Sequence, residues 1–250
     1  MQGQGHWTRS AQLPGQLIHG PTDFAIIGSR IIVAQTQGLL VSDDMGHSWR
    51  MAAHGRFLGI TPPRRDTEVV AAYGYKQLAI SRNAGQAWTV VRHPGHQPTT
   101  ALDQRGELLV ADGTRVSMLD SRWRTLPDLS HDNPYAVFSE SEGPVVLADH
   151  TGLTLWNGVS ATQVQVPRLI RNRGVQRAAI PTTGDEIATA SNLGDLAISC
   201  DRGATWSWLV KMNNSSAAAS GYVPSLSFDT RAGLLFAVLG SHLKRFVIHC

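Results

Sequence analysis

The chain has 250 residues, 42% of them hydrophobic, and its 22 basic and 19 acidic side chains give a formal net charge of +3. This length and apolar content suit one sizeable core, and no apolar run approaches the roughly 18 residues of a membrane-spanning helix. The mild charge, and an arginine cluster at residues 168–177 without interleaved aromatic residues, argue against a nucleic-acid surface.

The beginning of the chain and its cysteines bear on location. Residues 1–7 lack a basic stretch followed by an apolar one, so we expect no secretory signal. The two cysteines, Cys200 and Cys250, make neither a disulfide framework nor a zinc-binding pair. A reducing cytoplasm is therefore the predicted location, and the sequence leaves open whether the two cysteines meet.

Short alternating apolar stretches, separated by turns, predict β-strands along the whole chain. The first group comprises residues 24–27, 31–34, 39–41 and 49–51, and further groups begin at residues 57, 100, 135, 176 and 225. The last group ends one strand short, at residues 243–248. We expect residues 6–11 to supply the missing outer strand, because pairing the two termini would hide two exposed sheet edges.

Three segments share the frame Ser-x-(Asp/Asn)-x-Gly-x-(Ser/Thr/Ala)-Trp, at residues 42–49, 81–88 and 199–206. Each follows an apolar strand, so each is expected on a hairpin turn, where Asp or Asn accepts turn N–H groups and Gly supplies positive φ. The Trp ring would be buried between neighbouring units. Trp recurs at positions 7, 49, 88, 123 and 206. The first three intervals are 42, 39 and 35 residues and the last, of 83, corresponds to two periods, so the period is near 40 residues, which is typical of a four-stranded propeller blade. The residues expected to have this structural role are Asp44, Gly46, Trp49, Asn83, Gly85, Trp88, Asp201, Gly203 and Trp206.

The frame resembles the Asp-box (BNR) repeat of sialidase-like, sortilin-like and photosystem-II-assembly-factor-like β-propellers. Together with the period, it predicts an all-β, six-bladed propeller of four-stranded antiparallel blades in a single domain. The approximate blades are residues 22–54, 55–93, 97–128, 133–167, 174–212, and 221–250 completed by 5–13. The box itself is interpreted as a structural turn.

Seven of the ten histidines are expected at one end of the ring, opposite the repeated turns. His19, His54, His96 and His131 precede four consecutive inner strands, and His93, His150 and His242 lie on loops of the same end. Imidazole suits Cu, Fe, Zn or Ni, so these residues predict a transition-metal site at the mouth of the central channel. Asp23, Asp112, Asp132 and Asp149 are placed to orient the ligands. Asp112 and Asp149 each follow an Ala near the end of a second strand, so they are expected at equivalent positions of their blades. Such a site could activate water or oxygen, so an enzyme of this kind would be metal-dependent.

The alternative is that these are ordinary loop histidines, and that the chain is a non-catalytic assembly or interaction scaffold of the photosystem-assembly-factor-like type. That function needs only a shaped, partly basic surface. Resemblance to sialidases would require a Phe/Tyr-Arg-Ile-Pro motif, which this sequence lacks, so sialidase activity is not expected. The expected partner is a small molecule at the channel mouth or a protein.

Overall fold

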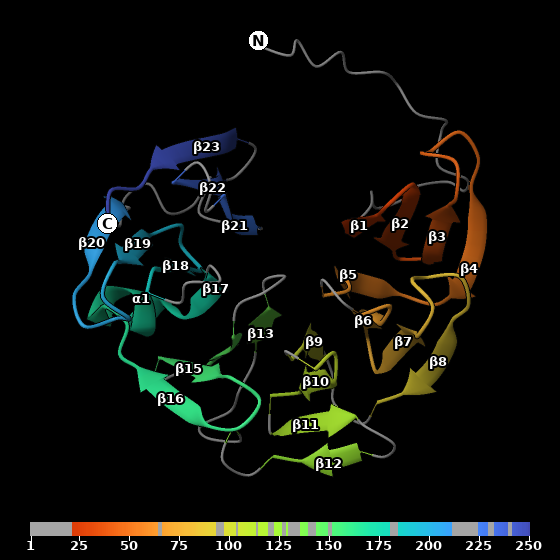
Figure 1. Ribbon diagram of the computed structural model, residues 1–250, viewed down its shortest axis with the longest axis horizontal. Helices are drawn as coiled ribbons and strands as arrows, with labels where there is room; N and C mark the ends of the chain where they lie inside the picture. Colours follow the sequence, from red (N-terminus) through yellow and green to blue (C-terminus); the bar gives the residue numbers. More distant parts are fainter. Residues whose placement is uncertain are drawn as a thin grey trace.

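A computed structural model shows six antiparallel sheets arranged in a ring around a central opening (Figure 1). It describes residues 22–64, 67–93, 98–103, 105–113, 115–119, 123–126, 129, 136–139, 144–149, 152–180, 185–211, 225–229, 233–239 and 242–250. The sheets follow one another in chain order, and we number them as blades 1 to 6. Each blade places its first strand nearest the opening and its last strand at the rim (Figure 1).

The first three blades each contain four strands. Blade 1 has β1 (Asp23–Ile27), β2 (Arg30–Gln35), β3 (Gly38–Ser42) and β4 (Arg50–His54). Blade 2 has β5 (Phe57–Thr61), β6 (Val70–Gly74), β7 (Gln77–Ser81) and β8 (Thr89–Arg92). Blade 3 has β9 (Thr99–Leu102), β10 (Leu108–Ala111), β11 (Val116–Leu119) and β12 (Trp123–Thr125).

The remaining blades differ in strand number. Blade 4 has β13 (Ala136–Ser139), β14 (Val145–Ala148), β15 (Leu153–Trp156) and β16 (Ala161–Val164). The short helix α1 (Arg168–Arg173) precedes blade 5, which has β17 (Val175–Ala179), β18 (Ile187–Ser191), β19 (Leu196–Ser199) and β20 (Ser207–Val210). Blade 6 has β21 (Ser225–Asp229), β22 (Leu234–Leu239) and β23 (His242–Val247). The predicted six-bladed, all-β propeller is confirmed, and the predicted N-terminal strand at residues 5–13 lies outside the described residues.

The antiparallel order gives the ring two different ends. The connections between third and fourth strands lie at one end, together with those between first and second strands; we call this the turn end. The connections from one blade to the next lie at the opposite, crossover end, together with those between second and third strands. No helix in the described part of the chain is long and apolar enough to cross a membrane.

The core lies between neighbouring blades rather than within one. Middle strands such as β3, β10 and β18 are buried along their whole length, whereas β12 at the rim is exposed throughout. One apolar cluster joins Ile32 of blade 1 to Phe57 and Val70 of blade 2, and another joins Val164 of blade 4 to Ile187 of blade 5. Because both faces of a middle strand are covered, its sequence is a short continuous apolar run.

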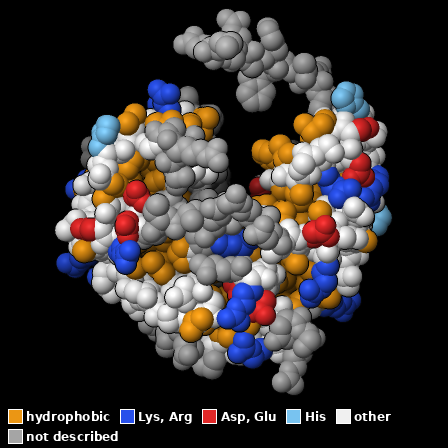
Figure 2. Space-filling view, viewed as in Figure 1, with side chains coloured by type: hydrophobic (Ala, Val, Ile, Leu, Met, Phe, Trp, Pro, Cys, Tyr) orange, Lys and Arg blue, Asp and Glu red, His pale blue; other side chains and the backbone are white. Residues whose placement is uncertain are grey.

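The ring formed by the described strands is open between blade 6 and blade 1 (Figure 1). Hydrophobic side chains face this gap from both sides (Figure 2). On blade 1, Phe24 and Ile26 of β1 are exposed, and on blade 6, Leu243 and Val247 of β23 are exposed. The third strand of blade 6 is therefore an exposed edge that carries both apolar and basic side chains, and an additional strand was expected to cover it.

A disulfide joins Cys200, directly after β19, to Cys250, which follows β23. The sequence predicts no disulfide framework and leaves open whether the two cysteines meet. They meet because each lies after the third strand of its blade, and blades 5 and 6 are neighbours in the ring. The disulfide fixes the C-terminal residue to the third repeated turn.

Candidate functional site

The first repeated turn, which follows β3, is held by a serine and an aspartate. Ser42 Oγ donates to Asp44 Oδ1 at 2.7 Å and accepts the Gly46 N–H at 2.7 Å. Asp44 also accepts the Ser48 N–H at Oδ1 (2.8 Å) and the Ser48 hydroxyl at Oδ2 (2.6 Å). These donors, the Ser48 hydroxyl foremost, hold the pKa of Asp44 far below its usual range. The carboxylate therefore stays ionised at neutral pH and stabilises the turn.

The other two repeated turns reproduce this geometry. Asn83 Oδ1 accepts the Ser81 hydroxyl and the Ala87 N–H, both at 2.9 Å. Asp201 accepts the Thr205 N–H at 2.8 Å and the Thr205 hydroxyl at 2.5 Å, and the hydroxyl foremost lowers the pKa of Asp201 to about 2. The glycines Gly46, Gly85 and Gly203 have φ of 91°, 83° and 89°, a left-handed conformation that favours glycine. The predicted structural role of the frame rests on these local hydrogen bonds.

Two of the three frame tryptophans lie between neighbouring blades. Trp88 donates to the Gly85 carbonyl at 3.1 Å and packs against the cluster shared by blades 1 and 2. Trp206 donates to the carbonyl of Gln165, on blade 4, at 2.9 Å and packs against the cluster shared by blades 4 and 5. In the described residues the indole N–H of Trp49 is buried without a hydrogen-bond partner. Trp88 and Trp206 therefore each fix their own blade to the preceding one.

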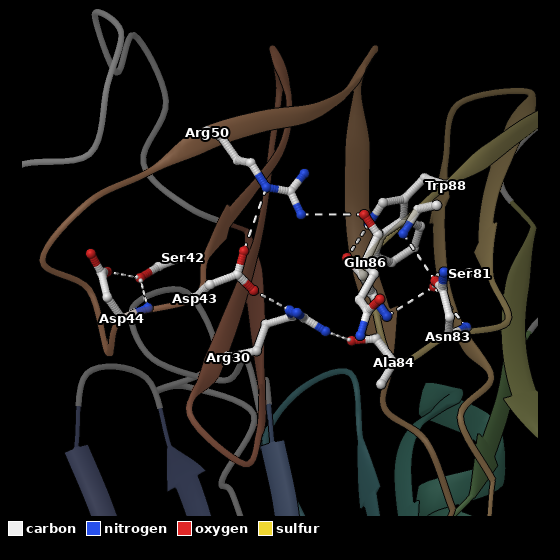
Figure 3. A network of polar contacts seen from close by, with 12 residues as sticks. Arg30, Ser42, Asp43, Asp44, Arg50, Ser81, Asn83, Ala84, Gln86 and Trp88 are labelled. Atoms are coloured by element: carbon white, nitrogen blue, oxygen red, sulfur yellow. Dashed lines mark hydrogen bonds and ion pairs between the residues drawn. The ribbon is translucent and has the colours of Figure 1, made fainter.

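A charged network links the first two repeated turns at the turn end (Figure 3). Asp43 forms ion pairs with Arg30 and, at 3.6 Å, with Arg50. Arg30 Nη1 donates to the Ala84 carbonyl at 2.7 Å, and Arg50 Nη2 donates to the Gln86 carbonyl at 3.3 Å. Both arginines thus reach from blade 1 to the turn of blade 2. Sequence reasoning missed this network, because nothing in the sequence indicates that residue 30 lies beside residue 84.

Three of the four aspartates expected to orient metal ligands lie in the described part of the chain, and each accepts a backbone N–H group. Asp23 accepts the N–H of Ile60 on blade 2 at 2.8 Å, and burial raises its pKa. Asp112 and Asp149 follow the second strands of their blades, and each accepts the N–H three residues later, at 3.1 and 3.0 Å. Their predicted equivalence is thus visible as the same turn contact. Asp112 also lies 3.5 Å from Arg115.

The described histidines of the expected cluster lie away from the channel mouth. His54 is the exposed last residue of rim strand β4, and His93 follows rim strand β8. His93 is buried, and its ring lies 5.7 Å from the Trp123 ring of blade 3. Burial lowers the pKa of His93, and the nearby Asp112 partly opposes this effect. The histidine side chains visible in Figure 2 lie at the rim.

One further member of the predicted metal site, His242, lies in the described part of the chain. His242 begins β23. Within the described ranges, no three His, Cys, Asp or Glu side chains are grouped in a way that would hold a metal ion. The transition-metal site at the channel mouth therefore stays a prediction. Its members outside the described residues are His19, His96, His131, His150 and Asp132.

A basic hollow of about 940 Å³ lies at the rim of blade 2, near the crossover end. Its wall includes Lys76 and Arg92, which are exposed, beside Tyr75 and the buried His93. The Lys76 ammonium lies 6.0 Å from the centre of the Tyr75 ring. Figure 2 shows further basic side chains near β4, β8 and β10–β11. The hollow thus combines two exposed cations with an aromatic ring.

Comparisons with known proteins agree on the fold. No protein-family model matches the chain, and no curated protein matches it either. A solved structure of YCF48 bound to a D1 peptide is similar with a TM-score of 0.65 and 13% identity, covering 92% of this chain and 78% of that one. YCF48 from Cyanidioschyzon merolae has a TM-score of 0.63 and 12% identity, over 90% of this chain and 81% of that one. The structure of U3-55K has a TM-score of 0.66 and 15% identity, covering 94% of this chain and 77% of that one. At these identities the likeness shows a β-propeller and no more.

Proposed function

We propose that this chain is a non-catalytic interaction scaffold of the photosystem-assembly-factor-like type, which binds an extended segment of a partner protein. We further propose that its three repeated turns are Asp-box repeats. The observation that carries the proposal is how the carboxylates are used. Five of those that the sequence singles out accept N–H groups of the ring itself: Asp23, Asp44, Asp112, Asp149 and Asp201.

These contacts make a rigid ring that presents surfaces rather than reactive groups. Asp23 and the Arg30–Asp43–Arg50 network join blade 1 to blade 2, and Trp206 joins blade 5 to blade 4. A preorganised surface loses little conformational freedom when it binds an extended peptide. Exposed basic side chains at the rim, such as Lys76 and Arg92, supply charge for partner selection. A solved propeller of similar fold, YCF48, is seen with a D1 peptide, which supports the same kind of partner here.

The proposal is tested by measuring peptide binding directly. The full chain is applied to an array of synthetic peptides that vary in net charge and aromatic content, and hits are titrated by fluorescence anisotropy. We expect sequence-dependent, saturable binding with a Kd on the order of micromolar, typical of a small peptide interface, and weaker binding at high salt. Equal, non-saturable binding of all peptides would overturn the proposal.

Elemental analysis of protein purified without a histidine tag separates this function from the metal site. The scaffold proposal expects no stoichiometric metal. A stoichiometric transition metal that is lost in both His19→Ala and His131→Ala would instead support the channel-mouth site. The His47→Ala variant is a suitable control, because His47 lies in the first repeated turn, at the opposite end.

A further inference from the structure

The repeated frame fills the turn end of two blade junctions from within the chain. At the junction of blades 1 and 2, a Cβ atom on Gly85 would lie 2.7 Å from Ile32 Cδ1, and Trp88 packs against the same cluster. At the junction of blades 4 and 5, a Cβ on Gly203 would overlap Val164, beside the Trp206 ring. In both cases the glycine lets the turn approach the preceding blade, and the Trp ring closes the junction.

The sequence of blade 3 does not contain the repeated frame. Its connection from β11 to β12 has three residues, 120–122, where blades 1, 2 and 5 have seven (43–49, 82–88 and 200–206). The sequence there, Asp-Ser-Arg, contains no glycine. Trp123, which follows it, has its ring beside His93, a residue from the crossover end of blade 2. Among the described residues, the junction of blades 2 and 3 therefore shows no frame Gly and Trp at its turn end. Gly106, in the connection from β9 to β10, does approach blade 2 there, since a Cβ on it would lie 2.4 Å from Thr67 Cγ2.

The space left there is a groove. Two hollows of about 530 and 360 Å³ share Ile80, Arg82 and Leu119 among their lining residues. The first also includes Val91 of β8, and the second includes Val69 and Leu108 together with Arg105. We call this the inter-blade groove: Ile80, Val91, Leu119, Val69, Arg82 and Arg105. Its floor is aliphatic, and its size lies within the usual range for ligand sites.

The charge at the mouth of the groove is unbalanced. Arg82 and Arg105 are exposed, and within the described residues neither forms an ion pair. Of the described acidic side chains, Glu107 is the one that lines the groove. Guanidinium groups in this position can take a carboxylate with two parallel hydrogen bonds.

We propose that the inter-blade groove binds an extended acidic segment of a partner protein, with one aromatic side chain of that segment inserted where Trp88 and Trp206 lie at the other junctions. Carboxylates on either side of the aromatic residue contact Arg82 and Arg105. This inference rests on the proposed scaffold function and names its partner surface. An apolar anchor flanked by charge-assisted contacts is the usual form of a small, specific peptide interface.

The test uses the full chain and a labelled ten-residue peptide with one Trp between two pairs of Glu. We expect binding to weaken at least about tenfold when the peptide Trp is replaced by Ala, and again when its Glu residues are replaced by Gln. On the protein, the Arg82→Glu/Arg105→Glu variant should lose binding. Arg168→Glu, at an exposed arginine of α1 at the crossover end, is the matched control and should bind normally.

A second measurement locates the peptide directly. A photoreactive benzophenone in place of the peptide Trp should cross-link to residues of β8 or β11. Each protein variant is first checked for an unchanged circular-dichroism melting curve. Binding that survives Arg82→Glu/Arg105→Glu but is lost in Lys76→Glu/Arg92→Glu would overturn the groove and leave the scaffold function intact. Failure of every peptide to bind the unmodified protein would overturn both.

Discussion

The disulfide between Cys200 and Cys250 should make the stability of this protein depend on its redox state. It encloses a loop with a sequence separation of 50 residues. In the chain-entropy model, closing a loop of that length destabilises the unfolded state by about 4 kcal/mol near 25 °C. For a chain of this size, each kcal/mol shifts the melting temperature by roughly 2–4 °C, so reduction should lower Tm by about 8–16 °C at most.

The assay is thermal unfolding followed by circular dichroism, with and without a phosphine reductant, with thiols counted before and after. The Cys250→Ser variant should melt like the reduced protein, and reductant should not affect the Cys200→Ser/Cys250→Ser protein. Equal Tm values for fully oxidised and fully reduced protein would refute the reasoning, because the loop would then contribute nothing. The cytoplasmic location stays a prediction, and a persistent disulfide would favour an oxidising compartment instead.

Three further predictions concern individual side chains, and a fourth concerns the N-terminal segment. Asp201 has a lowered pKa, so its contribution to stability is present above the unfolded pKa near 3.9 and is lost as the pH falls toward about 2. The Asp201→Asn variant should therefore lose less Tm between those pH values than the parent protein does. An unchanged dependence of Tm on acid pH would contradict this. Arg173 forms an ion pair at 2.8 Å with Asp195, which is fully buried. The Arg173→Ala variant should be less stable by about 3–5 kcal/mol in urea unfolding, because the buried carboxylate would lose its partner. A loss below about 1 kcal/mol would show that Asp195 finds another partner. Burial lowers the pKa of His93, so its neutral form stabilises the fold above the unfolded pKa, and this contribution is lost as the pH falls below about 6.5. Between pH 7.5 and 5.5, the Tm of the His93→Phe variant should therefore fall less than the Tm of the parent protein. Deletion of residues 1–12 should lower Tm strongly, because β23 would lose the strand that is expected at its exposed edge. An unchanged Tm would argue that residues 1–12 do not close the ring.

Local chemistry made part of the site predictable. The Ser-x-Asp-x-Gly frame predicted a turn because its donors and acceptors lie within five residues of one another, and Asp44 and Asp201 bind as expected. The position of Trp206 between blades followed from the period of the frame. The equivalence of Asp112 and Asp149 also followed from their place after the second strand.

Radial position was not predictable in the same way. The sequence predicted that His54 and His93 lie at the crossover end, and both follow or end a strand that leads there. Whether such a residue faces the channel or the rim depends on the order of strands within the sheet. Because β4 and β8 are rim strands, these two histidines lie far from the position expected for metal ligands (Figure 1). The sequence contains no signal for this difference.

What the sequence by itself determined is the repeating unit: its period, its turn and the apolar strands that a propeller requires. These depend on hydrogen bonds and alternation within a few residues, so they can be read without knowing what lies beside them. Only the tertiary structure decided which distant residues meet. It brought Cys200 to Cys250 and Arg30 to Ala84, and it left the inter-blade groove between the described strands of blades 2 and 3. Contacts of this kind arise because the ring places each blade against its neighbour, and no single blade contains that information.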